Sequence, residues 1–142
     1  MELTSLLLAD HAEAVNGKLY LVGGAWNRIA AGTLPAIHPH LTVAAVMAVP
    51  WTETNEKHAL QMEVVTEDGQ PVLPLPLNGE FEAGRPPGMR QGSAQNLVFC
   101  FNFNNLTLPN AGVYQFVLYV DGTELGRAGF ELVVAPQPTV TA

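Results

Sequence analysis

Apolar and polar residues alternate with a period of two along most of the chain, a pattern typical of strands that bury one face. Between Leu97 and Phe103 every odd-numbered residue is apolar, and between Val113 and Val120 every even-numbered residue is apolar. The apolar segments are short and are separated by turn-forming residues, which favours strands over helices. The predicted strands cover residues 3–9, 19–22, 41–49, 60–64, 72–83, 97–103, 113–120 and 130–134.

The segment 41–49 departs from the alternation because it is apolar on both faces and rich in Val and Ala. A strand of this kind lies either in the centre of a sheet or with its outer face against a partner. The pattern alone leaves both interpretations open.

Turn signals divide the predicted strands. Asn16-Gly17 and Asp121-Gly122 lie between apolar segments and are typical of tight hairpins. Gly23-Gly24 follows a predicted strand and indicates a bulge or bend. The spacing of strands and turns predicts an all-β protein, an antiparallel, immunoglobulin-like β-sandwich of about seven to nine strands.

The segment from Leu108 to Phe116 sharpens this prediction. Tyr114 follows the turn residue Gly112, as in the tyrosine corner of immunoglobulin-like sandwiches, where the hydroxyl bonds back to the preceding loop. No Cys follows at the position of an antibody-type disulfide, so that kind of core is excluded. The pattern favours a sandwich and says nothing about function.

Helical and domain signals are sparse. Residues 52–58 predict at most a short helical turn, with Thr52 or Thr54 as its N-cap. No linker divides the chain, so we expect a single domain over residues 1–135. Residues 136–142 contain two prolines and predict an extended C-terminal tail.

The composition narrows the class of protein. Of 142 residues only 13% are charged, about half the usual share, and the net charge is −7. Much of the surface must then consist of uncharged or apolar residues, and monomers seldom expose large apolar patches. The composition therefore favours a chain that associates with itself or with another protein.

The same data exclude several partners and compartments. An acidic chain is a poor ligand for nucleic acid or an anionic membrane surface. No apolar run is long enough to span a bilayer, and residues 6–9 are too short for a signal peptide. With the single cysteine Cys100 no internal disulfide can form. We expect a cytoplasmic protein, or a virion protein if it belongs to a phage particle.

His38-Pro39-His40, read with Gly32, resembles the first half of a cupin metal motif. Histidines two apart in a strand point to the same side and could share a metal ion. The motif then fails, because residues 42–46 contain no acidic side chain and no third histidine motif follows. We therefore reject His38 and His40 as a metal site and expect neither a metal nor a cofactor.

Other reactive side chains lack the partners that catalysis needs. Glu53, Asn55 and His58 could serve acid–base chemistry, but no Ser or Cys nucleophile accompanies them. We expect them to hydrogen-bond a connecting loop. Cys100 stands among aromatic residues with no nearby base to lower its pKa, so we expect a strand residue and not a nucleophile.

Four residues are candidates for binding: Trp26, Arg28, Trp51 and Arg85. Tryptophan and arginine are enriched at protein interfaces. Arg85 lies in a stiff Gly- and Pro-rich loop, where it would pair with Glu80, Glu82 or Glu53, or with an anionic ligand. A pocket at one end of the sandwich lined by Trp26, Trp51 and Arg85 would suit a carbohydrate or an anion.

Five blocks of the sequence, at residues 9–13, 17–26, 49–55, 79–88 and 112–122, resemble a known family. Its members are bacterial, mainly actinobacterial, single-domain proteins with no assigned activity. The resemblance spans nearly the whole chain and implies one β-sandwich domain. It implies no activity and no cofactor.

Together these observations predict a protein that is not an enzyme. The leading hypothesis is a structural or interaction module that forms a homo-oligomer or packs into a larger assembly. One alternative is a module that binds a small carbohydrate or anion. Another is an accessory or decoration subunit of a phage particle.

Overall fold

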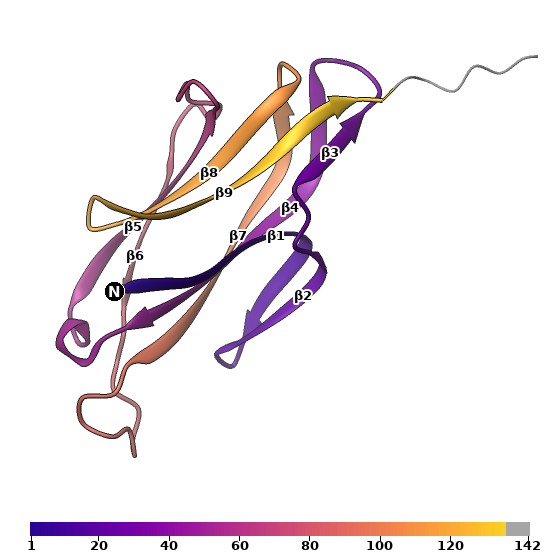
Figure 1. Cartoon of the computed structure of the whole chain (residues 1–142). Coiled ribbons are helices and arrows are strands. Elements are labelled where there is room, and N and C mark those ends of the chain that lie inside the picture. The colour runs from indigo at the N-terminus through magenta and orange to yellow at the C-terminus, as the bar shows by residue number, and fades with distance from the viewer. Residues whose placement is uncertain (136–142) are drawn as a thin grey trace, which may run out of the picture.

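Two β-sheets pack face to face in the computed structural model, which describes residues 1–135 (Figure 1). The strands are β1 (Glu2–Val15), β2 (Lys18–Gly24), β3 (Arg28–Ala31), β4 (Ala36–Val49), β5 (Lys57–Thr66), β6 (Leu77–Glu82), β7 (Gln95–Leu108), β8 (Gly112–Val120) and β9 (Thr123–Val134). A short 3₁₀ turn, η1 (Trp51–Glu53), joins β4 to β5. The strand orders are β2-β1-β4-β7 and β3-β9-β8-β5-β6. The prediction of an all-β sandwich is confirmed.

The apolar side chains of the period-two pattern fill the space between the sheets. Leu41 and Met47 of β4 and Phe116 of β8 are fully buried. The rings of Phe116 and Phe103 lie 5.0 Å apart, which joins β7 of one sheet to β8 of the other. Burying one large apolar side chain contributes about 1.5–3 kcal/mol, so this alternation is the main source of stability.

Both predicted hairpin turns are present. Asn16 and Gly17 connect β1 to β2, with φ angles of 51° and 73°. Asp121 and Gly122 connect β8 to β9, with φ angles of 51° and 80°. Two consecutive residues with positive φ form the turn whose twist matches that of the flanking strands, which explains the Asn-Gly and Asp-Gly pairs.

The tyrosine corner is also present. The Tyr114 hydroxyl donates a hydrogen bond to the carbonyl oxygen of Asn110 at 2.6 Å. The ring is buried and stacks on Phe130 at a centroid distance of 5.4 Å. The loop before β8 is thereby tied to the core.

The five-stranded sheet is mixed, although most of its strand pairs are antiparallel. β3 pairs with β9 in parallel. Only four residues long, it was too short to give a recognisable alternation. The strand expected over residues 72–83 forms only as β6, because Pro74 and Pro76 have no amide hydrogen for a ladder.

The short helical turn lies where it was expected, but its predicted cap is wrong. Pro50 occupies the N-cap, and Thr54 lies at the C-terminal end. The Thr54 hydroxyl donates to the Trp51 carbonyl oxygen at 2.6 Å, so it closes the end of the turn. The tail expected over residues 136–142 lies outside the described residues.

β1 changes partner halfway along its length. From Glu2 to Ala9 it pairs with β4, and from Ala9 to Val15 it pairs with β2. In Figure 1 the hairpin of β1 and β2 leaves the sandwich at the right-hand end of β1, and its turn points back to the lower left. Gly23 has a φ of 60° and faces Asp10 so closely that a Cβ would clash with the Asp10 side chain. This glycine lets the hairpin bend.

The hairpin covers part of the outer face of the four-stranded sheet. β1 contacts β7, although β4 lies between them in the sheet. Ala9, Ala12 and Ala44 form a small buried cluster against which Leu19 and Cys100 pack. Ala44 faces away from the main core and is nevertheless 0% exposed. Of the two interpretations of the segment 41–49, the central strand is confirmed. The outer face of β4 is covered in part by the chain's own hairpin.

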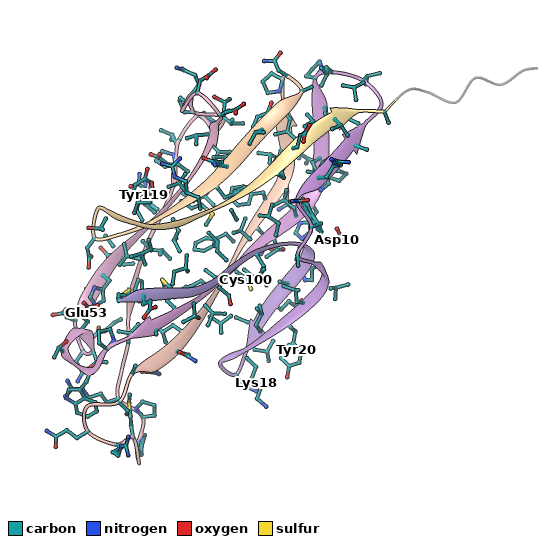
Figure 2. All side chains as sticks on the ribbon, in the orientation of Figure 1. Asp10, Lys18, Tyr20, Glu53, Cys100 and Tyr119 are labelled. Carbon is teal, nitrogen blue, oxygen red and sulfur yellow. The ribbon has the colours of Figure 1, made fainter. Side chains whose placement is uncertain are left out.

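The opposite face of the hairpin is open. Tyr20 is 55% exposed and Val22 is 65% exposed. Figure 2 shows Tyr20 and Lys18 pointing away from the sandwich near the turn. The hairpin thus has one apolar face inside the fold and one outside it.

Weakening the inner face of the hairpin should expose Cys100. Burial raises the pKa of the Cys100 thiol, which slows its reactions because the thiolate is the nucleophile. Leu19→Ser removes an apolar side chain from the small alanine cluster on which Cys100 also packs and costs roughly 1–2 kcal/mol of local stability, so the thiol should react about tenfold faster with a disulfide reagent. Tyr20→Ser, on the outer face, is the control and should leave the rate unchanged. Equal rates in the two variants would show that the hairpin does not cover Cys100.

Candidate functional site

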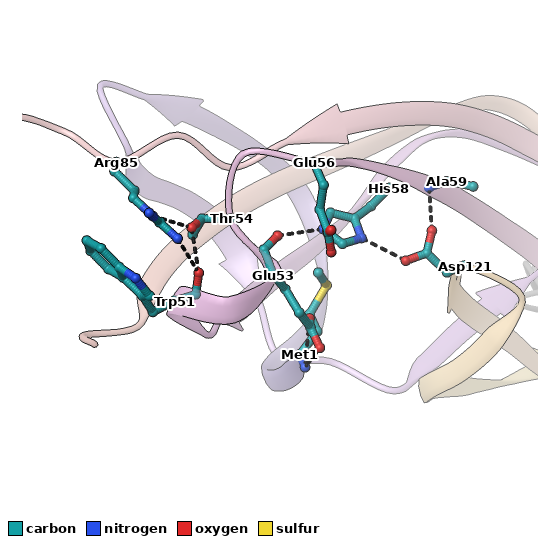
Figure 3. Close-up of polar contacts among 9 residues, drawn as sticks. All are labelled: Met1, Trp51, Glu53, Thr54, Glu56, His58, Ala59, Arg85 and Asp121. Carbon is teal, nitrogen blue, oxygen red and sulfur yellow. Dashed lines mark hydrogen bonds and ion pairs between the residues drawn. The ribbon is translucent and has the colours of Figure 1, made fainter. Parts of the chain in front are cut away.

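Arg85 and Trp51, two of the predicted binding residues, lie together (Figure 3). The Arg85 guanidinium carbon stands 3.7 Å from the centre of the Trp51 ring, a cation–π contact. Arg85 Nε donates to Thr54 Oγ1 at 2.6 Å, and its NH2 group donates to the Trp51 carbonyl oxygen at 2.9 Å. Thr54, itself buried, is thereby held between Arg85 and the 3₁₀ turn.

The expected pairing of Arg85 with a glutamate does not occur among the ion pairs of residues 1–135. The Trp51 carbonyl oxygen and the Thr54 hydroxyl accept its hydrogen bonds instead. The Trp51 carbonyl oxygen also accepts the Thr54 amide at 3.3 Å, so Arg85 adds a hydrogen bond to a group that already closes the turn. Arg85 therefore ties the loop before β7 to the turn after β4.

Trp26 and Arg28 lie elsewhere. Trp26 packs against His38 and Phe130 at centroid distances of 6.2 Å and 6.4 Å, and its buried indole Nε1 has no hydrogen-bond partner in the part of the chain that the structure describes. Arg28 is exposed at the start of β3. His38 lies near the start of β4 and Trp51 just after its end, so the 14-residue strand separates the two tryptophans by roughly 40 Å. The structure does not bring the four candidates into one pocket, and ligand binding by them stays a prediction.

His58 is the centre of a polar cluster beside the turn of the β8–β9 hairpin. Its side chain is 4% exposed. Nδ1–H donates to Asp121 Oδ2 at 2.7 Å, and Nε2–H donates to the Glu53 carbonyl oxygen at 2.8 Å. Both partners are acceptors only, so the ring carries two protons and is a cation. Asp121 Oδ1 also accepts the Ala59 amide at 2.9 Å.

The charges of this cluster stabilise each other. Burial acts to lower the pKa of His58, but the hydrogen bonds to Asp121 and to the Glu53 carbonyl outweigh it, and the pKa is raised. The pKa of Asp121 is lowered, chiefly by the hydrogen bond from His58. The amino group of Met1 pairs with Glu53 at 3.0 Å. Among the described residues this network contains hydrogen bonds of His58, Asp121, Glu53 and Met1 but none of a hydroxyl or thiol, and it holds η1, β5 and the β8–β9 turn together.

A second polar cluster crosses three strands on the outer face of the four-stranded sheet. His11 Nδ1 lies 3.0 Å from His40 Nε2. On the far side of each ring, His11 Nε2 is 3.0 Å from Glu13 Oε1, and His40 Nδ1 is 2.7 Å from Asn104 Oδ1. The strand register explains why these side chains lie side by side. β4 pairs His40 with Asn104. The β1–β4 ladder ends at Ala9, opposite Thr42, which brings His11 next to His40.

His40 therefore pairs with His11 and not with His38. Asn105 has a φ of 53° and forms an irregularity in β7 opposite Pro39, after which the strands resume with the other face inward. His38 consequently packs on Trp26, and burial lowers its pKa. Residues two apart in a regular strand point to the same side, but His38 and His40 do not, because β4 is irregular between them.

Only part of the His11–His40 cluster can be predicted from the sequence. The spacing of His11 and Glu13 places both on one side of a strand, but their meeting with His40 needs the register of two strands far apart in sequence. Within residues 1–135 no three His, Cys, Asp or Glu side chains gather closely enough to hold a metal ion by themselves. No helix in that range is long and apolar enough to cross a membrane.

Comparisons with known proteins add a family and little else. The family model described as "Family of unknown function (DUF6941)" matches residues 4–133. No curated protein matches the chain. Among solved structures the chain is similar to "Pseudomonas fluorescens alkylpurine DNA glycosylase AlkC bound to DNA containing an abasic site analog", at 14% identity and a TM-score of 0.38. The match covers 89% of this chain and only 30% of that one, and a TM-score this low supports no inference.

We expect the free energy of unfolding to fall as the pH rises through the folded-state pKa of His58. In the unfolded chain His58 titrates at its ordinary pKa of about 6.5, and the folded-state pKa is higher. The stabilisation is therefore complete below about pH 6.5 and is lost above the folded-state pKa. Urea unfolding at several pH values from about 5.5 to about 9 measures this slope.

His58→Gln isolates this contribution, because glutamine hydrogen-bonds but takes up no proton in this range. The variant should lose this part of the pH dependence and unfold about 1–3 kcal/mol more easily near pH 6. Glu67→Gln, in an exposed turn, is the matched control and should keep the wild-type slope. A wild-type slope in His58→Gln would contradict the charged His58.

Proposed function

We propose that this chain, which belongs to the family of unknown function DUF6941, is a non-enzymatic interaction module that binds a second copy of itself through the edge of β2. The observation that carries the proposal is the open side of the β1–β2 hairpin. Tyr20 and Val22 are more than half exposed on a strand that, within residues 1–135, pairs only with β1. An exposed apolar edge strand is a template for pairing with another chain.

The other sheet edges carry features that discourage such pairing. β3 is only four residues long. β6 carries Glu80 and Glu82, and the backbone of β7 is irregular at Asn105, which has a φ of 53°. Short length, charge and irregular backbone all protect edge strands. In β2 the only charged residue is Lys18, at its first position. β2 is therefore the edge best suited to bind another strand.

Charge also favours the hairpin as the place of contact. The chain carries a net charge of −7, so two copies repel each other over most of their surfaces. Residues 11–25 contain one acidic and one basic side chain, Glu13 and Lys18. An approach through this nearly neutral segment brings the two copies together where repulsion is weakest.

A twofold arrangement gives β2 a complementary register. In an antiparallel pair centred on Leu21, Tyr20 of each copy lies opposite Val22 of the other, and Lys18 lies opposite Gly24. Aromatic and β-branched side chains are favourable cross-strand neighbours, and no like charges meet. Because each copy contributes the same strand, the pairing closes as a dimer.

The more specific expectations do not enter this proposal. A bacterial, mainly actinobacterial, origin, a cytoplasmic location, a decoration role on a phage particle and the binding of a carbohydrate or anion all stay predictions. Support for a non-enzymatic role comes from the His58 and Arg85 clusters, whose hydrogen bonds are taken up within the fold.

The native mass at several concentrations tests the proposal. One edge strand and its neighbours make a small interface, so we expect a monomer–dimer equilibrium with a Kd of about 1–100 µM. Val22→Lys should weaken the dimer at least about tenfold, because in each copy the apolar contact of Val22 with Tyr20 of the other copy would be replaced by a charged side chain. Ile37→Lys is the control, since Ile37 is 63% exposed but lies outside the hairpin. A monomer at every concentration, or equal effects of the two variants, would contradict the proposal.

A further inference from the structure

We propose that His11 Nδ1 and His40 Nε2 together bind one divalent transition-metal ion, of the class of Zn²⁺, Ni²⁺ and Cu²⁺, on the outer face of the four-stranded sheet. Imidazole nitrogen is the protein ligand that these ions share. The site does not depend on the dimer, because both ligands belong to one chain. It also differs from the rejected pair of His38 and His40, since β1 supplies the second ring.

The partners on the far sides of the rings direct two lone pairs at each other. Glu13 Oε1 accepts from His11 Nε2, so the ring hydrogen of neutral His11 lies there and Nδ1 is bare. Asn104 Oδ1 accepts from His40 Nδ1, so the hydrogen of neutral His40 lies on Nδ1 and Nε2 is bare. The two bare nitrogens stand 3.0 Å apart, a repulsive arrangement that a shared cation relieves.

The distance suits one ion. With metal–nitrogen bonds of about 2.0–2.1 Å, two nitrogens 3.0 Å apart subtend roughly 95° at an ion that lies beside the line joining them. That angle lies close to the right angle of square-planar or octahedral coordination. The rings face each other nearly head-on, with centroids 5.2 Å apart, so each must turn toward the ion to bind it. His11 and Glu13 are exposed to solvent, so water can complete the ligand set.

The surroundings resemble those of metal-binding histidines in general. A ligating histidine usually donates its other ring N–H to a carboxylate or an amide oxygen, which fixes the tautomer and makes the ligand more basic. Glu13 serves His11 in this way, and Asn104 serves His40. Thr42 donates to Asn102 at 2.8 Å, and its oxygen, 3.4 Å from His40 Nε2, also has a lone pair on this side.

An ion here would tighten the bend in β1. The backbone ladder between β1 and β4 ends at Ala9, two residues before His11. Joining His11 to His40 through a metal extends the link between the strands past that end. Bound metal should therefore raise the melting temperature, because a ligand that binds only the folded state stabilises it.

Calorimetric titration of tag-free, chelator-treated protein with ZnCl₂, NiCl₂ and CuCl₂ tests the site. We expect one equivalent to bind, and the electron paramagnetic resonance spectrum of the Cu²⁺ form to show coupling to two imidazole nitrogens. His11→Ala and His40→Ala should each weaken binding at least about tenfold, and Glu13→Gln about 10–100-fold. His38→Ala is the control and should bind as the wild type does.

Two results would overturn the proposal. One is the absence of saturable binding up to about millimolar metal, or binding that both His11→Ala and His40→Ala leave unchanged while their metal-free melting temperatures show that they are folded. The other comes from nitrogen NMR of the metal-free protein. If His40 carries its hydrogen on Nε2, the Asn104 amide group faces Nδ1, the hydrogen-bonded chain is closed, and the facing lone pairs do not exist.

Discussion

The exchange of partners by β1 at Ala9 is the constraint on which the other features depend. A straight β1 would continue its ladder with β4 and place residues 10–15 opposite residues 36–41. Because the strand bends and pairs with β2, the hairpin instead buries Ala44 and shields Cys100. The same bend points His11 at His40 and leaves β2 as an edge with Tyr20 and Val22 outside. Gly23, with its positive φ and its close approach to Asp10, makes this conformation accessible.

The strands and hairpins can be predicted from the alternation of apolar and polar residues and from the turn residues. The bend of β1 and the strand β3 depend on contacts between residues far apart in the sequence. The alternation in residues 97–103 and 113–120 and the Asn-Gly and Asp-Gly turns identify strands and hairpins, because both depend on neighbouring residues. The bend of β1 was missed, since a period of two describes each half of a bent strand equally well. β3 was missed because four residues gain their strand form from pairing with β9. The partner expected for residues 41–49 is in part the chain itself.

The polar clusters show the same limit. Sequence reasoning grouped His58 with Glu53 correctly, since the two are close in the chain, but Asp121 comes from a turn 63 residues away. It grouped His40 with His38 by the period of a strand, whereas the irregularity at Asn105 and Pro39 turns the two to opposite faces. The internal hydrogen bonds of His58 and Arg85 account for their positions within the fold. The hairpin edge and the His11–His40 pair remain the features that face outward.

Hydrogen–deuterium exchange at low and high protein concentration tests the central claim, association through β2, most directly. If two copies pair along this edge, the outward amides of Lys18–Gly24 should exchange more slowly at high concentration, while those of the β6 edge, Leu77–Glu82, keep the same rate. Exchange in β2 that is independent of concentration, in a sample whose native mass includes dimer, would contradict the account.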